Sequence, residues 1–279
     1  MAAIADLSDL INRATGGNSG TPGYEMFFKQ ARIGGAAAPA TIAGRPHSLW
    51  LYEGNPVGAA APGTTGVSLT NSQAAAIPFT NPAGGRQSWL TSAWASASQG
   101  GTLLLYDRLL HNGGMSGTNV AAQTVGGTLS RYTDGLGNFA FVEIYTLIGT
   151  TATTFVLSYT NENGVSGRTS VNALIGGTGF REQSRVMFVP LQSGDRGVQA
   201  VANFDLVATT GTVGSIGVTI GHPLATLQIG IAGSSGWRDF VTGLPGFPEI
   251  KSGACLALLW IPQTTTAADF IGGYSKVEA

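Results

Sequence analysis

The residues that could carry out chemistry are few in this sequence and stand far apart. The three histidines, His47, His111 and His222, show no HExxH or other paired spacing, so a zinc site would have to assemble from distant parts of the chain. Single histidines of this kind ordinarily lie in turns or at the surface. We therefore expect neither a metal ion nor a cofactor.

Motifs for nucleotide binding and nucleophilic catalysis are absent as well. A phosphate-binding loop needs GxxxxGK[ST], and Lys29, Lys251 and Lys276 all stand in other contexts. The GSSG stretch at 233–236 lacks the G-x-S-x-G spacing of a hydrolase nucleophile. A pair of glycosidase carboxylates on distant strands would leave no trace in the sequence, so that alternative stays open. The prediction is nevertheless that the protein is not an enzyme.

Glu143 is the one carboxylate that interrupts a strongly apolar run, FAFVEIYTLI. A buried carboxylate needs a partner, and Arg131, Arg168 or Arg185 could supply the charge. We expect a structural ion pair here rather than a catalytic acid. In SGDRG, Asp195 is expected to cap its own turn through the backbone.

Composition points to β-structure and to association with other chains. Only 10% of the residues are charged, and 42 of the 279 are glycine, which suits many short strands joined by glycine-rich turns. A surface poor in charge resembles the core of an interface. The net charge of −1 argues against nucleic-acid binding. The longest apolar run, 254–261, is too short to cross a membrane and holds the single cysteine, Cys255, which we expect to be buried.

Two adjacent runs, Phe139–Leu147 and Thr153–Thr160, form the centre of the predicted fold. The first is apolar on both faces, as in a buried strand, and the second alternates between apolar and polar residues. Asn163-Gly164 follows them and predicts a tight hairpin with a type I′ turn, because glycine and asparagine tolerate positive φ. Residues 168–175 are expected to return as a third strand.

The N-terminus has the clearest helical pattern, with Ile4, Leu7, Leu10 and Ile11 at helical spacing before Gly16-Gly17. A helix this short is marginal alone and must dock on something. Two alternatives stay open, namely an arm that reaches a partner and a helix packed on its own subunit. The small-residue segment 34–46 is expected to run over a surface and to contact another subunit.

Together these features predict an all-β fold, an antiparallel β-sandwich of the jelly-roll or immunoglobulin-like type with glycine-rich turns, a short N-terminal helix and extended arms. Aromatic side chains in glycine- and proline-rich surroundings serve as core residues or as interface anchors, more plausibly than as a sugar platform. The interface candidates are Ile4, Leu7, Leu10, Ile11, Trp89, Trp94, Trp237 and Phe240. The predicted organisation is a helix and flexible arm at 1–23, an irregular extension or small domain at 24–118, a sandwich domain at 119–262 and an extended or partly loose tail at 263–279.

Several phrases resemble structural proteins from the virions of tailed bacteriophages, in an uncharacterised family encoded among head and tail genes: SLWLYEGNPVGAAAP, GTLLLYDRLLHNGGMSGT, LSRYTDGLG with FVEIYTLIGTTATT, SYTNENGVSGRT and VPLQSGDRGVQAV. The resemblance covers nearly the whole chain and includes no catalytic residues. It implies a non-enzymatic, self-assembling virion component that is assembled in the bacterial cytoplasm.

Within that resemblance, the favoured role is a capsid decoration (cement) protein, bound to the outside of the shell and bridging neighbouring capsid subunits. Its partners would be the major capsid protein and further copies of itself, as a dimer or trimer. The alternative is a tail, baseplate or fibre component that binds a host receptor or glycan. The major capsid protein itself is disfavoured, because the tailed-phage shell fold needs a long spine helix and the only helical period here is at 4–14.

Overall fold

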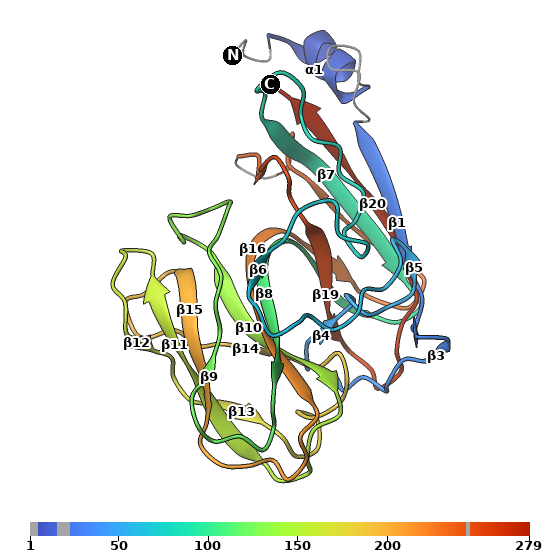
Figure 1. Ribbon diagram of the computed structural model, residues 1–279. Coiled ribbons are helices and arrows are strands. Elements are labelled where there is room, and N and C mark those ends of the chain that lie inside the picture. The colour runs from blue at the N-terminus through green and yellow to red at the C-terminus, as the bar shows by residue number, and fades with distance from the viewer. Residues whose placement is uncertain (1–4, 16–22, 244–245) are drawn as a thin grey trace.

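A computed structural model describes residues 5–15, 23–243 and 246–279, and nearly all regular structure in this part of the chain is β-strand (Figure 1). The single described helix is α1 (Leu7–Ala14), and it is far too short to cross a membrane. The strands are β1 (Tyr24–Lys29), β2 (Arg32–Ile33), β3 (Ala36–Ala37), β4 (His47–Ser48), β5 (Gly54–Asn55), β6 (Val67–Ser68), β7 (Ser88–Ala97), β8 (Gly101–Met115), β9 (Gln123–Thr124), β10 (Phe139–Thr146), β11 (Thr153–Asn161), β12 (Arg168–Thr169), β13 (Ala173–Ile175), β14 (Val186–Phe188), β15 (Val198–Leu206), β16 (Ser215–Ile229), β17 (Ser235–Asp239), β18 (Glu249–Ile250), β19 (Leu256–Pro262) and β20 (Phe270–Glu278).

The strands form three main sheets with antiparallel pairing, which confirms the predicted all-β sandwich architecture. Sheet A has the order β17-β7-β20-β1-β5, with β18 also on β7, and sheet C has the order β14-β10-β16-β8-β19-β4, with β6 also on β8. Sheet D has the order β12-β11-β15-β9, with β13 on β11, and a small sheet B joins β2 to β3.

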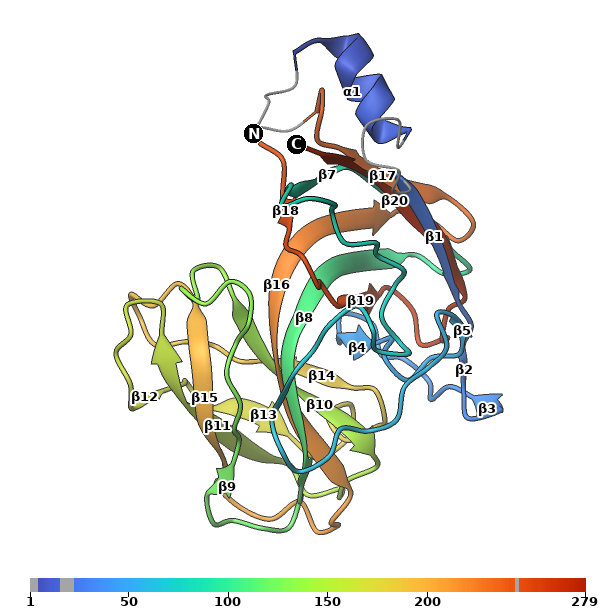
Figure 2. The ribbon, with the colours of Figure 1, turned by 45° about the horizontal axis from the view of Figure 1, so that its top comes forward.

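Two long strands, β8 and β16, connect two sandwiches that share sheet C (Figure 2). One half of each strand packs with sheet A around a core that includes Leu103 and Leu227. The other half packs with sheet D around a second core that includes Leu110 and Val218. The register between β8 and β16 shifts at Ile220 and again after Pro223, and such bulges bend a strand and re-aim its side chains.

A third core covers the opposite face of sheet C. The chain segment 49–77 runs over this face in an irregular path and buries Trp50, Leu51 and Leu69 against Tyr106 and Tyr145. The small residues of this segment let its backbone lie close to the sheet, as where Gly113 N–H donates to Gly63 O over 2.8 Å. Cys255 is buried in the same core, as expected.

Several local predictions are confirmed and others need correction. Strands β12 and β13 both pair with β11, so residues 168–175 do return along the predicted hairpin. The turn at Asn163-Gly164 is not of type I′, because that type needs a positive φ at both central residues and only Gly164, at 75°, has one. The segment 34–46 folds back on its own chain, where the Thr41 hydroxyl donates to Thr264 O and Thr266 O.

The C-terminal segment is the clearest correction. Residues 263–279 were expected to be an extended or partly loose tail, but β20 lies in the middle of sheet A and pairs with β1 on one side and β7 on the other. Its Phe270, Tyr274 and Val277 side chains are buried. Strands from both sides of residue 118 share sheets A and C, so the sheets do not follow the predicted boundary.

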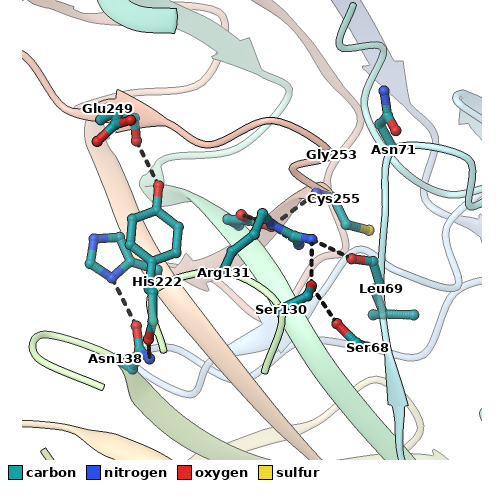
Figure 3. Close-up of polar contacts among 12 residues, drawn as sticks. Ser68, Leu69, Asn71, Ser130, Arg131, Asn138, His222, Glu249, Gly253 and Cys255 are labelled. Carbon is teal, nitrogen blue, oxygen red and sulfur yellow. Dashed lines mark hydrogen bonds and ion pairs between the residues drawn. The ribbon is translucent and has the colours of Figure 1, made fainter. Parts of the chain in front are cut away.

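A loop from the second sandwich is fastened to the first by buried polar contacts (Figure 3). Arg131 donates twice to the Asp107 carboxylate of β8, at 2.8 Å each, and once to Leu69 O. The Cys255 backbone N–H donates to the same carboxylate over 2.9 Å. Next to it, Tyr132 stacks on His222 with 3.8 Å between ring centroids. These contacts hold the two sandwiches together at their junction.

Candidate functional site

The first strand carries an exposed row of large apolar side chains. Successive residues of a strand point to opposite faces, so in YEMFFK the side chains of Tyr24, Met26 and Phe28 share one face. They are 45%, 45% and 44% exposed, whereas Phe27 and Lys29 on the other face are buried. The row therefore lies on the outer face of sheet A, away from its core.

Strand pairing extends this row across the whole sheet. In one transverse row Trp237 of β17 lies opposite Trp94 of β7, which lies opposite Gly273 of β20 and then Met26 of β1. The next row runs through Ser235, Ser96, Ile271 and Phe28. The ribbon views show these strands side by side along sheet A (Figures 1 and 2). We call the apolar set the aromatic face: Tyr24, Met26, Phe28, Trp94, Trp237 and Ile271.

Gly273 permits one contact that organises the aromatic face. A Cβ at this position would lie 2.8 Å from the Tyr24 hydroxyl oxygen, so only glycine lets the tyrosine ring cross β20. The Tyr24 hydroxyl thereby accepts a hydrogen bond of 3.0 Å from the Trp94 indole N–H. This hydrogen bond fixes the two aromatic side chains relative to each other.

The aromatic face carries no charge. Neither transverse row contains a charged residue. Arg238, the neighbour of Trp237, turns away and donates to Thr226 O. Asp239 ends the third row, which runs through Ser92 and Ser275 to Tyr24, and its carboxylate accepts from the backbone N–H groups of Val241 and Thr242. Apart from the hydroxyl groups of Ser96, Ser235 and Tyr24, the outward side chains of the two uncharged rows and of Tyr24 are apolar or aromatic, a composition typical of contacts between proteins.

Helix α1 borders this face at one end. Asp6 caps the helix by accepting from Asp9 N–H over 2.8 Å, and Arg13 donates to Glu278 O of β20 over 2.9 Å. A hollow of about 380 Å³ lies between the helix and the sheet, beside Leu10 and Ser92. The helix packs on its own sheet, and Leu7 and Ile11 add 68% and 55% exposed side chains next to the aromatic face.

The predicted interface residues divide into three groups. Trp94 and Trp237, distant in sequence, come together on the aromatic face, and Leu7 and Ile11 are exposed beside it. Leu10 is half-buried under α1, and Ile4 lies outside the described residues. Trp89 lies further along β7, next to a separate hollow of about 240 Å³ that Phe247 and Val277 also line.

Phe240 is a correction to this set. It is 7% exposed and belongs to the core between sheets A and C. Its backbone N–H donates to Thr91 O at the end of β17, which turns the ring into the sandwich. A buried ring of this kind cannot anchor a partner on the surface.

Sequence reasoning missed four members of the aromatic face: Tyr24, Met26, Phe28 and Ile271. The alternation in YEMFFK groups the first three on one face, opposite Glu25, Phe27 and Lys29, and by polarity alone that apolar face would be expected to be the buried one. No local signal distinguished the exposed face of this strand from the buried one. Ile271 was missed because its segment was expected to be a loose tail.

The chemical candidates are engaged in structural contacts. Glu143 pairs with Arg108 at 2.8 Å, both side chains are 0% exposed, and none of the three arginines predicted as its partner is used. Tyr145 donates to the same carboxylate oxygen over 2.9 Å. Strands β10 and β8 flank β16 on its two sides, so the Glu143 and Arg108 side chains meet across the face of β16, which carries Gly217 and Gly221 at the paired positions.

Asp195 and the histidines also differ from expectation. The Asp195 carboxylate does not cap its own turn but accepts from Arg168, Tyr159 and Asn161, and hydrogen bonds with Arg168 and Tyr159 lower its pKa to about 2. His47 and His111 are buried rather than at the surface, and burial lowers the pKa of each to about 3. In the described part of the chain, no three His, Cys, Asp or Glu side chains gather where they could hold a metal ion.

Comparison with known proteins gives no family. No family model and no curated protein matches the chain. A solved structure of the VP2 subviral particle of infectious bursal disease virus shows 10% identity and a TM-score of 0.15, over 91% of this chain and 79% of that chain. A mutant VP2 of the same virus, in derived T=1 particles, shows 10% identity and a TM-score of 0.12, over 92% and 74%. TM-scores this low carry no argument about fold or function.

Proposed function

We propose that this protein is a structural component of a tailed-phage virion, and specifically a decoration protein on the outside of the capsid. The observation that carries the proposal is the aromatic face, an uncharged apolar surface of six side chains on a rigid sheet. Soluble monomers rarely expose contiguous patches of this kind, and larger ones mark contacts with other proteins. The resemblance of several sequence phrases to phage virion proteins supplies the setting.

In this role the protein acts by contact alone. Covering the aromatic face removes apolar groups from water and stabilises the assembly by roughly 25 cal/mol for each Å² of apolar surface buried. A stable contact of this type buries upward of about 1,000 Å² in total. The partners are the major capsid protein and further copies of this chain, and the decoration protein stabilises the shell by bridging neighbouring capsid subunits.

The test is co-sedimentation of the purified protein with empty, undecorated shells of its own phage. We expect saturable binding with a stoichiometry that matches shell symmetry, together with a higher melting temperature of the shell. Bovine serum albumin serves as the non-binding control. If the protein does not bind shells in a saturable way at any concentration tested, the proposal is contradicted.

A second candidate function rests on two neighbouring tryptophans, Trp237, which is 67% exposed, and Trp94, which is half-buried. Adjacent tryptophans can stack against sugar rings, and a tail or fibre protein could use them to bind a host glycan. Against this, Met26, Phe28 and Ile271 share the face, and they offer a hydroxylated ligand no hydrogen bonds. Antibody labelling of the tail in electron micrographs, combined with no binding to shells, would favour the glycan role.

A further inference from the structure

We propose that the partner covering the aromatic face is a second copy of this chain, so that the protein is a two-fold symmetric dimer joined through sheet A. The inference rests on the proposed function in one respect, because it takes this face to be an assembly contact of a virion protein. It names the partner at that contact. In the dimer, the surfaces outside this contact would be present twice. The two copies could then each contact one of two neighbouring capsid subunits, which a bridging protein requires.

Charge is the first argument for a second copy. In a two-fold contact the same surface patch of both copies is brought together, so a net charge on that patch would repel the same charge on the other copy. The two transverse rows through Trp237 and Ser235 hold no charged residue, and two carboxylates lie at the border of the face: Asp239 in the row of Tyr24, and Asp269 beside the hollow described below. Homodimer interfaces are also the more apolar class of protein contacts. The centre of the face therefore brings no like charges together when it pairs with itself.

Shape is the second argument. A two-fold contact requires that one face carry both a projecting group and a hollow, because each copy must receive what the other presents. Trp237 projects, being 67% exposed. A hollow of about 280 Å³ lies next to Ser96 and Ile271, one row further along the same face, and is also bordered by Gly233 and Asp269. A tryptophan side chain fits a hollow of this size, and a two-fold axis midway between the two features seats both tryptophans at once.

Hydrogen bonding supports the same arrangement. The indole N–H of Trp237 has no hydrogen-bond partner in the described part of the chain, whereas that of Trp94 is bonded to Tyr24. Asp269 at the rim of the hollow uses one carboxylate oxygen to accept from Ala31 N–H over 2.7 Å. Its second oxygen can accept the indole N–H of a second copy's Trp237. Buried indole N–H groups usually find such a partner.

The test is the mass of the purified full-length protein in solution, measured by sedimentation equilibrium. We expect twice the 28.5 kDa of one chain. Trp237→Ser removes the projecting group, and Met26→Lys introduces a charge from each copy into the apolar contact, so both variants should sediment as monomers. Both side chains are exposed, so the fold should persist, and circular dichroism with thermal unfolding checks this. Val207→Ser, which truncates a 64% exposed residue on the other sandwich, is the matched control and should stay dimeric.

The outcomes separate this inference from the proposed function. A native protein that is monomeric yet binds shells overturns the dimer and leaves the decoration role intact. A native dimer that dissociates in Trp237→Ser but never binds shells supports the dimer and contradicts the decoration role. A dimer that persists in both Trp237→Ser and Met26→Lys places the contact elsewhere and overturns the inference.

Discussion

At the scale of residues, buried charges are the costliest features of this protein. Arg108 is 0% exposed and donates to the Glu143 carboxylate and to the hydroxyl groups of Tyr145 and Tyr106. It also stacks under the Trp50 ring, 4.5 Å from the centroid. A buried pair of this kind need not stabilise the fold relative to an apolar core, but removal of one partner leaves the other charge unpaired.

We predict that Arg108→Ala lowers the free energy of unfolding by about 3–5 kcal/mol, because Glu143 would remain buried without its partner. The measurement is urea unfolding followed by circular dichroism. Arg196→Ala, which changes a 74% exposed arginine near Glu162, is the control and should cost less than about 1 kcal/mol. Equal losses in the two variants would contradict the structural role of the buried pair.

His47 makes the stability depend on acidity. Its Nε2 accepts from Arg185 over 2.6 Å, and burial together with the Arg185 charge lowers its pKa to about 3. The unfolded chain has a histidine pKa near 6.5, so between about pH 6.5 and pH 3 the unfolded state binds more protons than the folded state. Stability is therefore complete above this window and decreases as the pH falls through it.

We predict that His47 alone lowers the free energy of unfolding by about 2 kcal/mol between pH 7 and pH 5, since each unit of pKa difference corresponds to about 1.36 kcal/mol. Urea unfolding of the native protein and of His47→Gln at both values of pH measures it. Glutamine keeps an acceptor for Arg185 but does not titrate, so the variant should lose less stability than the native protein. Identical losses would show that folding does not lower the pKa of His47, and would contradict the prediction.

At the scale of elements, α1 and β20 differ in whether they contribute side chains to a hydrophobic core. No described residue of α1 belongs to any of the three cores, whereas β20 supplies Phe270 and Tyr274 to the core between sheets A and C. Helix α1 contacts its own sheet, yet its Leu7 and Ile11 are exposed. The two alternatives for this helix therefore combine, since it packs on its own subunit and still has apolar side chains for a partner.

Deletion of residues 1–20 should weaken attachment to shells without unfolding the sandwiches. The physical reason is that the deletion removes the exposed Leu7 and Ile11 but no core side chain of the described helix. Co-sedimentation with shells measures attachment, and thermal unfolding measures stability. Loss of soluble, folded protein would instead show that the N-terminal segment is part of the folding core.

At the scale of the whole molecule, the two sandwiches form one mechanical frame. Strands β8 and β16 run through both of them, so neither sandwich can be removed without breaking the longest strand pair of sheet C. The Arg131 contacts with Asp107 and Leu69 fasten a loop of the second sandwich against the first. Sheet A, which carries the aromatic face, packs on the half of this frame that includes Leu103 and Leu227.

Shared strands predict that the protein unfolds in a single cooperative transition. In differential scanning calorimetry, the calorimetric and van't Hoff enthalpies should agree, which is the criterion for two-state behaviour. Cooperativity over 279 residues is unusual for separate domains and follows here from the common strands. Two resolved transitions would mean that the sandwiches unfold independently despite β8 and β16.

Local patterns predicted much of the secondary structure. The alternating run from Thr153 to Asn161 is a strand, residues 7–14 are a helix, and Cys255 lies in a buried strand environment. These features depend on neighbouring residues, namely the period of apolar positions and the turn residues that end each element. The interface candidates Trp94 and Trp237 were found in the same way, as aromatic residues in glycine-rich surroundings.

The sequence by itself determined that this chain is all-β, poor in charge and equipped with a short amphipathic helix, because each of these properties is local or compositional. Only the tertiary structure decided that Trp94 lies beside Trp237, that Glu143 pairs with Arg108 and that β20 lies between β1 and β7. Those outcomes depend on strand pairings such as Tyr24 with Ser275, which join distant parts of the chain. Pairing partners are chosen by the fit of whole faces, and no short stretch of sequence records that fit.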